Sequence, residues 1–126
     1  MDNIEIYTDI EKRITTHVVT GKISIDGIIS VLEEFYSKTP DFHLLWDFSG
    51  ADVSGFKKQG LEKILYAAKE FAKSKNVGKR AIVAPTDLGY GLARMYETFT
   101  ELLNHSVSHK VFRSKNKAMD WLLMDT

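Results

Sequence analysis

Two kinds of apolar pattern alternate along the whole chain and restrict the folds that it can adopt. Short runs rich in β-branched and other apolar residues are typical of strands, whereas apolar residues three and four positions apart are typical of amphipathic helices. The strand pattern occurs at residues 4–7, 14–20, 43–48, 80–83 and 107–112. The helix pattern follows Ser24, Ser54, Thr86 or Asp87, and Ser114, all of which are suitable N-caps. The predicted order is ββαβαβαβα, with residues 49–53 as a loop.

This order of elements predicts the fold class. The first two strands are close enough in sequence to form an antiparallel hairpin. The strands that then alternate with helices imply parallel crossovers. The chain has 126 residues, the size of one domain, and contains no recognisable linker or repeat. We therefore expect a single α/β domain over residues 1–126, with a mixed, mostly parallel sheet covered by helices.

The composition excludes several classes of protein. Apolar residues make up 44% of the chain and charged residues 27%, which are values for a globular protein rather than a disordered one. The chain has no cysteine, so disulfides, thiolate metal sites and cysteine nucleophiles are excluded. The N-terminal segment resembles no signal peptide, and no stretch approaches the roughly 20 apolar residues of a membrane span. We expect a cytoplasmic protein.

Charge is unevenly distributed, although 17 basic and 17 acidic residues balance overall. Basic residues outnumber acidic ones between Lys57 and Arg80, and the rest of the chain has the opposite excess. A basic segment of this kind is either the solvated face of a helix or a surface for anionic lipid or nucleic acid. The helix face is the commoner case, and we expect no nucleic-acid partner.

The motifs of the common enzyme classes are incomplete. His105 and His109 are four residues apart but lack a third ligand nearby, so we interpret them as scattered surface histidines rather than a metal site. Gly89-Tyr90-Gly91 begins like a dinucleotide fingerprint, but Arg94 stands where the third glycine is needed. No serine lies in a Gly-x-Ser-x-Gly elbow. We predict no catalytic residues, no metal and no cofactor, and hence a binding module rather than an enzyme.

Polar residues follow the predicted parallel strands at the edge where ligands bind to open α/β sheets. They are Asp47, Ser49, Asp52, Ser54, Thr86, Asp87 and Arg113. Together with helix N-termini they could hold a phosphate or another anion. The alternative is that these residues cap helices and close turns, as their side chains commonly do.

Four segments resemble the SpoIIAA-like family of small bacterial proteins. They are VVTGKISIDGIISVLEEFYS (18–37), HLLWDFSGADVSGF (43–56), AIVAPTDLGYGLARMYETF (81–99) and KVFRSKNKAMDWL (110–122). The resemblance covers nearly the whole chain. It implies a STAS-type fold, which is related in shape to the CRAL-TRIO lipid-carrier domain.

The resemblance implies two kinds of function. STAS domains of anti-sigma antagonists switch partners when a serine is phosphorylated, and Ser54 aligns with that serine, although the Asp-Ser that precedes it in the family is absent here. The CRAL-TRIO likeness instead implies a site for an apolar or lipid-like ligand, together with peripheral membrane contact.

The first hypothesis is therefore a pocket under the third predicted helix for a small apolar or lipid-like molecule. Its expected lining is Trp46, Gly89, Tyr90, Gly91, Met95 and Tyr96. Phe56, Lys57 and Lys58 are expected to contact an anionic membrane at its inner face, unless Phe56 packs as a staple on its own helix. The second hypothesis is a partner-switching protein in which Ser54 is the phosphoacceptor and another protein is the partner. A homodimer is compatible with either hypothesis.

Overall fold

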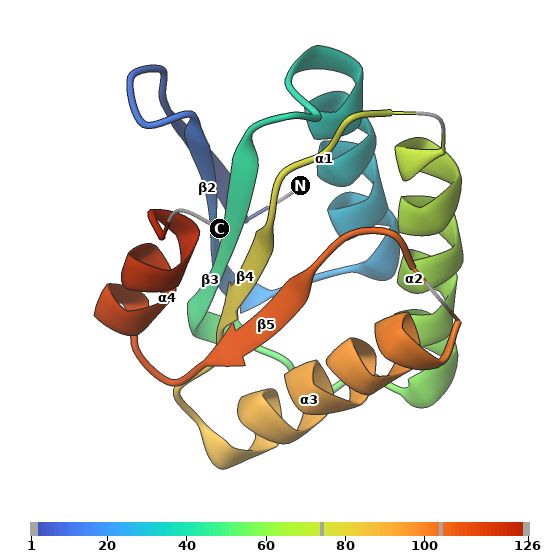
Figure 1. Cartoon of the computed structure of the whole chain (residues 1–126). Helices are drawn as coiled ribbons and strands as arrows, with labels where there is room; N and C mark the ends of the chain where they lie inside the picture. Colours follow the sequence, from blue (N-terminus) through green and yellow to red (C-terminus); the bar gives the residue numbers. More distant parts are fainter. Residues whose placement is uncertain (1–2, 74, 104, 125–126) are drawn as a thin grey trace.

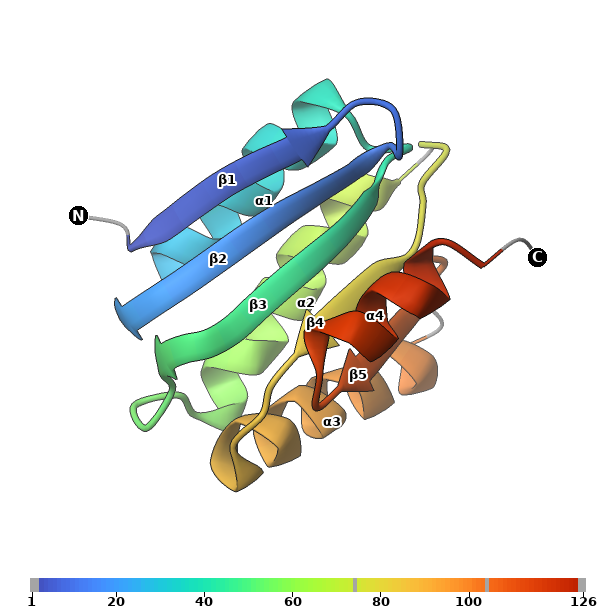
Figure 2. The ribbon, with the colours of Figure 1, turned by 90° about the vertical axis from the view of Figure 1, so that its left-hand side faces the viewer.

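Five strands form one mixed sheet in the computed structural model, which describes residues 3–73, 75–103 and 105–124. Their order across the sheet, β1-β2-β3-β4-β5, is the same as their order along the chain (Figure 2). They are β1 (Ile4–Asp9), β2 (Ile14–Lys22), β3 (His43–Asp52), β4 (Arg80–Val83) and β5 (His109–Phe112). β1 pairs with β2 in the antiparallel direction, and the other neighbours are parallel. The predicted α/β fold and its element order are confirmed.

Three helices cover one face of the sheet, and the last helix covers the other (Figures 1 and 2). The helices are α1 (Ile25–Lys38), α2 (Lys58–Ala72), α3 (Asp87–Leu102) and α4 (Lys115–Leu122). Each of the first three connects two neighbouring parallel strands. Because such crossovers have the same hand and here always advance in the same direction across the sheet, they place α1, α2 and α3 on one side.

Each face of the sheet therefore carries its own apolar core. Successive side chains along a strand point to opposite faces. Leu44 and Trp46 of β3 thus belong to the core under α1–α3, whereas Leu45 belongs to the core under α4. In β4, Ile82 faces the first core and Ala81 the second. β4 is buried along its whole length because helices cover both of its sides.

Short polar side chains begin three of the helices. The Ser24 hydroxyl accepts a hydrogen bond from the backbone N–H of Gly27 at 2.9 Å. Thr86 caps α3 through the N–H of Gly89 at 3.1 Å, and Ser114 caps α4 through the N–H of Lys117 at 3.2 Å. The predicted caps at Ser24 and Ser114 are confirmed, and Thr86 rather than Asp87 is the cap of α3.

The connection between β3 and α2 differs from the prediction. β3 continues to Asp52, through most of the segment expected to be a loop, because it pairs there with Thr20 to Lys22 of β2 beyond a bulge. α2 does not begin after Ser54 but at Lys58, and its N-cap Lys57 makes no side-chain capping bond. Ser54 lies in the turn before the helix.

The helices of the described segments are also too short or too polar to cross a lipid bilayer.

A candidate binding cavity under α1, α2 and α3

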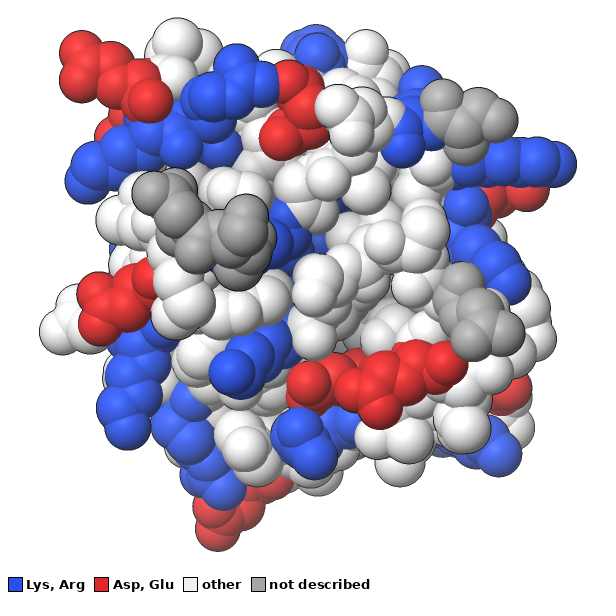
Figure 3. All heavy atoms as spheres, in the orientation of Figure 1, with Lys and Arg blue, Asp and Glu red and all other residues white. Residues whose placement is uncertain are grey.

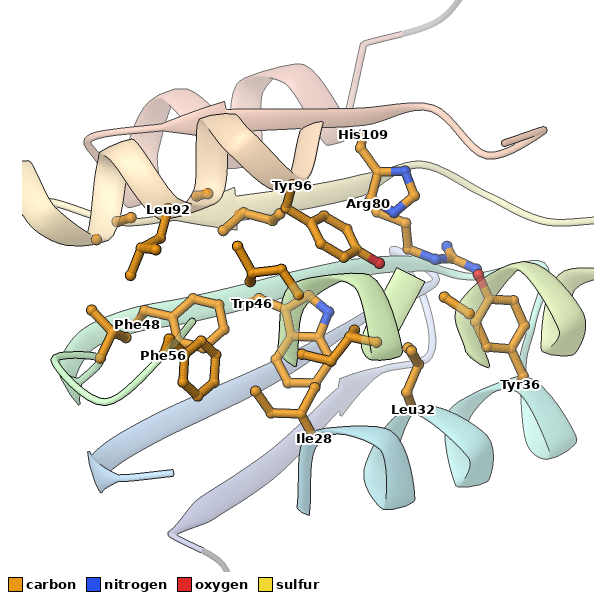
Figure 4. Close-up of a pocket in the computed structure, with 18 residues that line it drawn as sticks. Ile28, Leu32, Tyr36, Trp46, Phe48, Phe56, Arg80, Leu92, Tyr96 and His109 are labelled. Atoms are coloured by element: carbon orange, nitrogen blue, oxygen red, sulfur yellow. The ribbon is translucent and has the colours of Figure 1, made fainter. Parts of the chain in front are cut away.

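A cavity of about 80 Å³ lies between the sheet and the three helices on its first face. One buried water needs only roughly 10–15 Å³, so the space is much larger than a packing defect. Apolar side chains from the strands and from all three helices make up most of its wall (Figure 4). They include Ile28, Leu32, Trp46, Phe48, Val53, Phe56, Leu61, Ile64, Ile82 and Leu92. Figure 3 shows mostly uncharged side chains between α2 and α3, with basic side chains over α2 and acidic ones over α3.

Aromatic rings form one end of the cavity. Trp46 and Phe48 are two positions apart on β3, so both rings point to the same face of the sheet. The two rings are stacked, with centroids 5.8 Å apart and planes inclined by 8°. Phe56 reaches the same end from the turn before α2, and Leu92 reaches it from α3 (Figure 4). This end of the cavity offers only apolar contact.

Polar side chains gather at the other end. Figure 4 shows Tyr36 of α1, Arg80 of β4, Tyr96 of α3 and His109 of β5 there. The rings of Tyr96 and His109 lie edge to face with centroids 5.6 Å apart. The cavity is therefore amphipathic, with an aromatic end and a cationic end.

Arg80 is the least expected of these residues, because its side chain is only 2% exposed. One terminal nitrogen, Nη1, donates to the carbonyls of Phe42 at 3.0 Å and Lys79 at 3.1 Å, and the other, Nη2, donates to the carbonyl of Pro40 at 3.1 Å. The guanidinium carbon lies 4.8 Å from the centre of the Phe35 ring and 5.0 Å from that of Tyr36. Within the described segments it forms no ion pair with a carboxylate, and its Nε–H has no hydrogen-bond partner.

Burial keeps His109 and Tyr96 of this end neutral near pH 7. It lowers the pKa of His109 to about 3, an effect that the Val107 carbonyl opposes and that His105 and Arg80 reinforce. It also raises the pKa of the Tyr96 hydroxyl well above the usual range. The phenol therefore remains protonated and can donate a hydrogen bond.

The two histidines of this region are not scattered on the surface, contrary to the prediction. The rings of His105 and His109 lie 5.1 Å apart and are partly buried beside α3. In the part of the chain that the structure describes, no three histidine, aspartate or glutamate side chains are placed to hold a metal ion. The pair has a hydrogen-bonding role instead, since the ring nitrogens of His105 and His109 contact the backbone of Val107.

The structure brings together three of the six residues predicted to line the pocket. Trp46, Gly89 and Tyr96 line the cavity. Tyr90, Gly91 and Met95 are outside the lining, to which α3 contributes positions 89, 92, 93 and 96. The Tyr90 ring packs instead under Arg113, whose guanidinium carbon lies 4.2 Å from the ring centre.

Of the residues at the cationic end, Tyr96 was predicted to line the pocket, whereas Tyr36, Arg80 and His109 were not. For α3, residues 89, 92, 93 and 96 form one helical stripe, which is a pattern that the sequence does show. Arg80 belonged both to the basic segment and to the strand predicted at residues 80–83. Nothing in either pattern indicated that Arg80 lines a cavity.

The predicted membrane-contact residues occupy different environments. Phe56 is half-buried and lines the cavity, whereas Lys57 and Lys58 are exposed. The ammonium of Lys58 lies 5.9 Å from the centre of the Phe99 ring of α3. Membrane contact through these residues stays a prediction.

Ser54 is exposed, and its hydroxyl donates to the Asp52 carboxylate at 2.6 Å. This contact and the backbone N–H of Ser54 lower the pKa of Asp52. A phosphate on Ser54 would lie beside that carboxylate and three residues before the N-cap of α2. The geometry therefore lacks the favourable helix N-terminus that the phosphorylation hypothesis assumed. That hypothesis stays untested.

The polar residues at the carboxyl edge of the sheet do not form one site. Asp47 accepts from the N–H of Ser49 at 3.0 Å, and Asp87 pairs with Arg113 at 2.8 Å. Thr86 caps its helix. Each carries out a local turn or capping role, as the alternative interpretation expected. The sheet order also never reverses, so the crevice that doubly wound sheets offer to ligands at this edge does not form.

No protein-family model matches the chain, and no curated protein matches it. Membership of the SpoIIAA-like family therefore stays a prediction.

Proposed function

We propose that this protein is a non-catalytic binding module whose cavity under α1, α2 and α3 takes the apolar part of a small ligand. The observation that carries the proposal is the cavity itself, with its wall of aromatic and aliphatic side chains. Protein cores are normally packed as densely as organic crystals. A space of about 80 Å³ beside the core departs from that packing, and the apolar part of a ligand that enters it is removed from water by the aromatic and aliphatic wall.

The chemistry of the wall favours binding over catalysis. The described lining residues include no carboxylate, lysine or serine. His109 is the titratable base among them, and burial holds its pKa far below neutral pH. A general base is most effective when its pKa is near the working pH. The cavity therefore offers shape and apolar contact rather than proton transfer.

The two tryptophans provide a direct test. Trp46 lines the cavity, whereas Trp121 packs against Phe112 on the other face of the sheet. Trp46 is therefore the only indole that remains in a Trp121→Phe variant. Titration of this variant with 1-decanol should change the Trp46 fluorescence in a saturable manner. The absence of a saturable change would contradict the proposal.

A matched pair of substitutions on α3 locates the binding. Ala93 lines the cavity, and Met95 on the same helix is 39% exposed and outside the lining. Ala93→Phe in the Trp121→Phe background should fill the space and abolish the response to decanol. Met95→Phe should leave the response unchanged. Equal responses from the two variants would place the binding elsewhere.

The proposal includes contact with an anionic membrane, from which an apolar ligand would be taken. It is supported by the position of Phe56 at the aromatic end of the cavity, next to the exposed pair Lys57 and Lys58. We expect sedimentation with vesicles that contain anionic lipid and little sedimentation with neutral vesicles. The double variant Lys57→Glu/Lys58→Glu should lose this difference. If wild-type protein ignores anionic vesicles, the membrane contact is wrong while the cavity proposal stands.

A further inference from the structure

We propose that the ligand of this cavity is an amphiphile with a single carboxylate head, which pairs with Arg80 while its apolar chain lies along Trp46 toward Phe48 and Phe56. This inference rests on the proposed binding function and adds the chemical class of the ligand. It follows from the placement of one buried charge at one end of an otherwise apolar cavity (Figure 4).

The first step is the charge of Arg80. A guanidinium stays protonated at any ordinary pH, so a positive charge is held at a position that is only 2% exposed. Buried charges are normally paired, because removal of an ion from water costs several kcal/mol. The three carbonyls and two aromatic rings around Arg80 carry partial negative charge, but none supplies the full charge of a carboxylate.

The second step is the donors that remain at this end. The contacts of Arg80 with Phe42, Lys79 and Pro40 use its terminal nitrogens and leave its Nε–H without a partner. These contacts hold the three carbonyls in place, but they do not account for the position of Arg80 in the wall of the cavity. The protonated phenol of Tyr96 lies at the same end (Figure 4). A carboxylate that accepts from this hydroxyl would lie beside the guanidinium, whose Nε–H is enclosed by protein atoms, and would neutralise its charge.

The third step is the number of negative charges that the site can neutralise. His109 is neutral at pH 7, so it adds no second positive charge to that of Arg80. No lysine or further arginine is among the described lining residues. One cation in a site of low polarity matches a monoanion and leaves a dianion such as a phosphate monoester with an unpaired charge. The site therefore favours a carboxylate over a phosphate.

The experiment compares ligands of equal chain length and different heads. Decanoate, 1-decanol and decyl phosphate are titrated into the Trp121→Phe protein at pH 7, and the fluorescence of Trp46 is measured. Decanoate should bind about tenfold more tightly than decanol, since a hydrogen bond to a charged group is worth at least about 1.4 kcal/mol. Decyl phosphate should bind more weakly than decanoate.

The outcomes separate the two proposals. If decanol binds as tightly as decanoate, the carboxylate inference is wrong and the apolar binding function stands. If none of the three ligands changes the fluorescence, both proposals are wrong. Tighter binding of decyl phosphate than of decanoate would also overturn the inference.

Substitution of the arginine tests its role directly. Arg80→Met should remove the preference for decanoate over decanol. Arg113→Met is the matched control, because Arg113 also stacks on a tyrosine ring but lies outside the cavity. The control should keep the preference. An Arg80→Met protein that folds and still prefers decanoate would overturn the inference.

A measurement on unsubstituted Arg80 covers the case in which Arg80→Met does not fold. The Nε–H resonance of Arg80 in proton–nitrogen spectra should shift when decanoate is added, because a negative charge then lies beside the guanidinium. Decanol should leave this resonance in place. A resonance that decanoate does not move would show that the head group lies elsewhere.

Discussion

Two glycines that look equivalent in the sequence have different roles in α3. A Cβ atom at Gly89 would lie 2.9 Å from the Thr86 hydroxyl oxygen and 3.6 Å from the Cβ of Ala84. At Gly91 nothing lies within 4 Å of the same position. Gly89 therefore permits Thr86 and Ala84 to lie close to the helix backbone beside the cavity. At Gly91 the helix surface has room for a side chain.

Replacement of each glycine by alanine tests this difference. Gly91→Ala should raise the free energy of unfolding by about 0.5–1 kcal/mol, because alanine is the better helix former and meets no neighbour. Gly89→Ala should lower it by about 1 kcal/mol, because the new methyl group displaces the capping hydroxyl. Urea unfolding of both variants measures the two effects. A stabilised Gly89→Ala protein would contradict the assigned role of Gly89.

Single residues also mark the limit of sequence-based prediction. Trp46 and Tyr96 were predicted to line the pocket because large aromatic side chains belong in cores and cavities. Arg80 was not, because a sequence shows the charge of an arginine but not its burial. Tyr90 was misplaced because it lies about 100° around α3 from Gly89 and therefore on a different side of the helix.

At the level of elements, α2 begins without a side-chain cap. Its N-cap is Lys57, whose positive charge also lies unfavourably near the positive end of the helix dipole. The prediction chose Ser54 because serine is a good cap, but the Ser54 hydroxyl bonds the Asp52 carboxylate and the helix begins at Lys58. Pairing with β2 past the bulge extends β3 to Asp52, and no local pattern encodes that pairing.

A better cap at this position should stabilise the protein. Lys57→Asp should raise the free energy of unfolding by about 1 kcal/mol, whereas Ser24→Ala, which removes a working cap, should lower it by a similar amount. Ser54→Ala should have little effect on stability. These three variants are compared by urea unfolding at neutral pH. A loss of about 1 kcal/mol in Ser54→Ala would show that Ser54 does support the helix.

Helix α4 tests the independence of the two cores. Leu122 is 1% exposed in the core under α4, on the face of the sheet opposite to the cavity. Leu122→Ala should lower the free energy of unfolding by about 2–5 kcal/mol. The substitution is made in the Trp121→Phe protein. At temperatures at which the Leu122→Ala variant is folded, its affinity for 1-decanol should equal that of the Trp121→Phe protein. Unfolding and Trp46 titration of the same preparation measure both quantities.

At the scale of the whole molecule, the four histidines couple stability to pH, because each is partly or fully buried. Burial lowers the pKa of His43, and Lys79, Arg80 and Arg13 reinforce the effect. Burial lowers the pKa of His17 to about 4, with Glu34 opposing and Arg80 reinforcing the effect. It also lowers the pKa of His105 to about 4 and of His109 to about 3. In the unfolded chain these groups titrate near 6.5. The unfolded state thus binds more protons than the folded state between the two values.

The stabilisation that comes from these neutral histidines should therefore be complete above pH 6.5. The free energy of unfolding should fall as the pH is lowered toward 4. Each histidine contributes at most about 1.4 kcal/mol per pH unit to this slope. His17→Leu should reduce the slope, because it removes one of the titrating groups. Urea unfolding at several pH values gives the dependence. An equally steep slope in the variant would mean that His17 does not titrate as its burial implies.

The overall arrangement was predictable, whereas the lining of the cavity was predicted only in part. Element order follows from local patterns that each segment carries by itself, such as the apolar runs around Trp46 and Ile82. The cavity depends on how side chains from α1, α2, α3 and the sheet fill a shared space, and volumes are not visible in a sequence. For the same reason the positions of Tyr36, Arg80 and His109 at the cationic end were known only from the three-dimensional structure.

The strand order has a consequence for synthesis of the protein. Because each strand pairs with the one that precedes it, every segment that leaves the ribosome finds its partner already made. Folding can then advance from the N-terminus without waiting for distant parts of the chain. α4 emerges after all the strands and packs against Ile14 and Leu45, which were made much earlier. Completion of the second core should therefore be the last step, and nascent chains that stop before α4 should expose an apolar sheet face to chaperones.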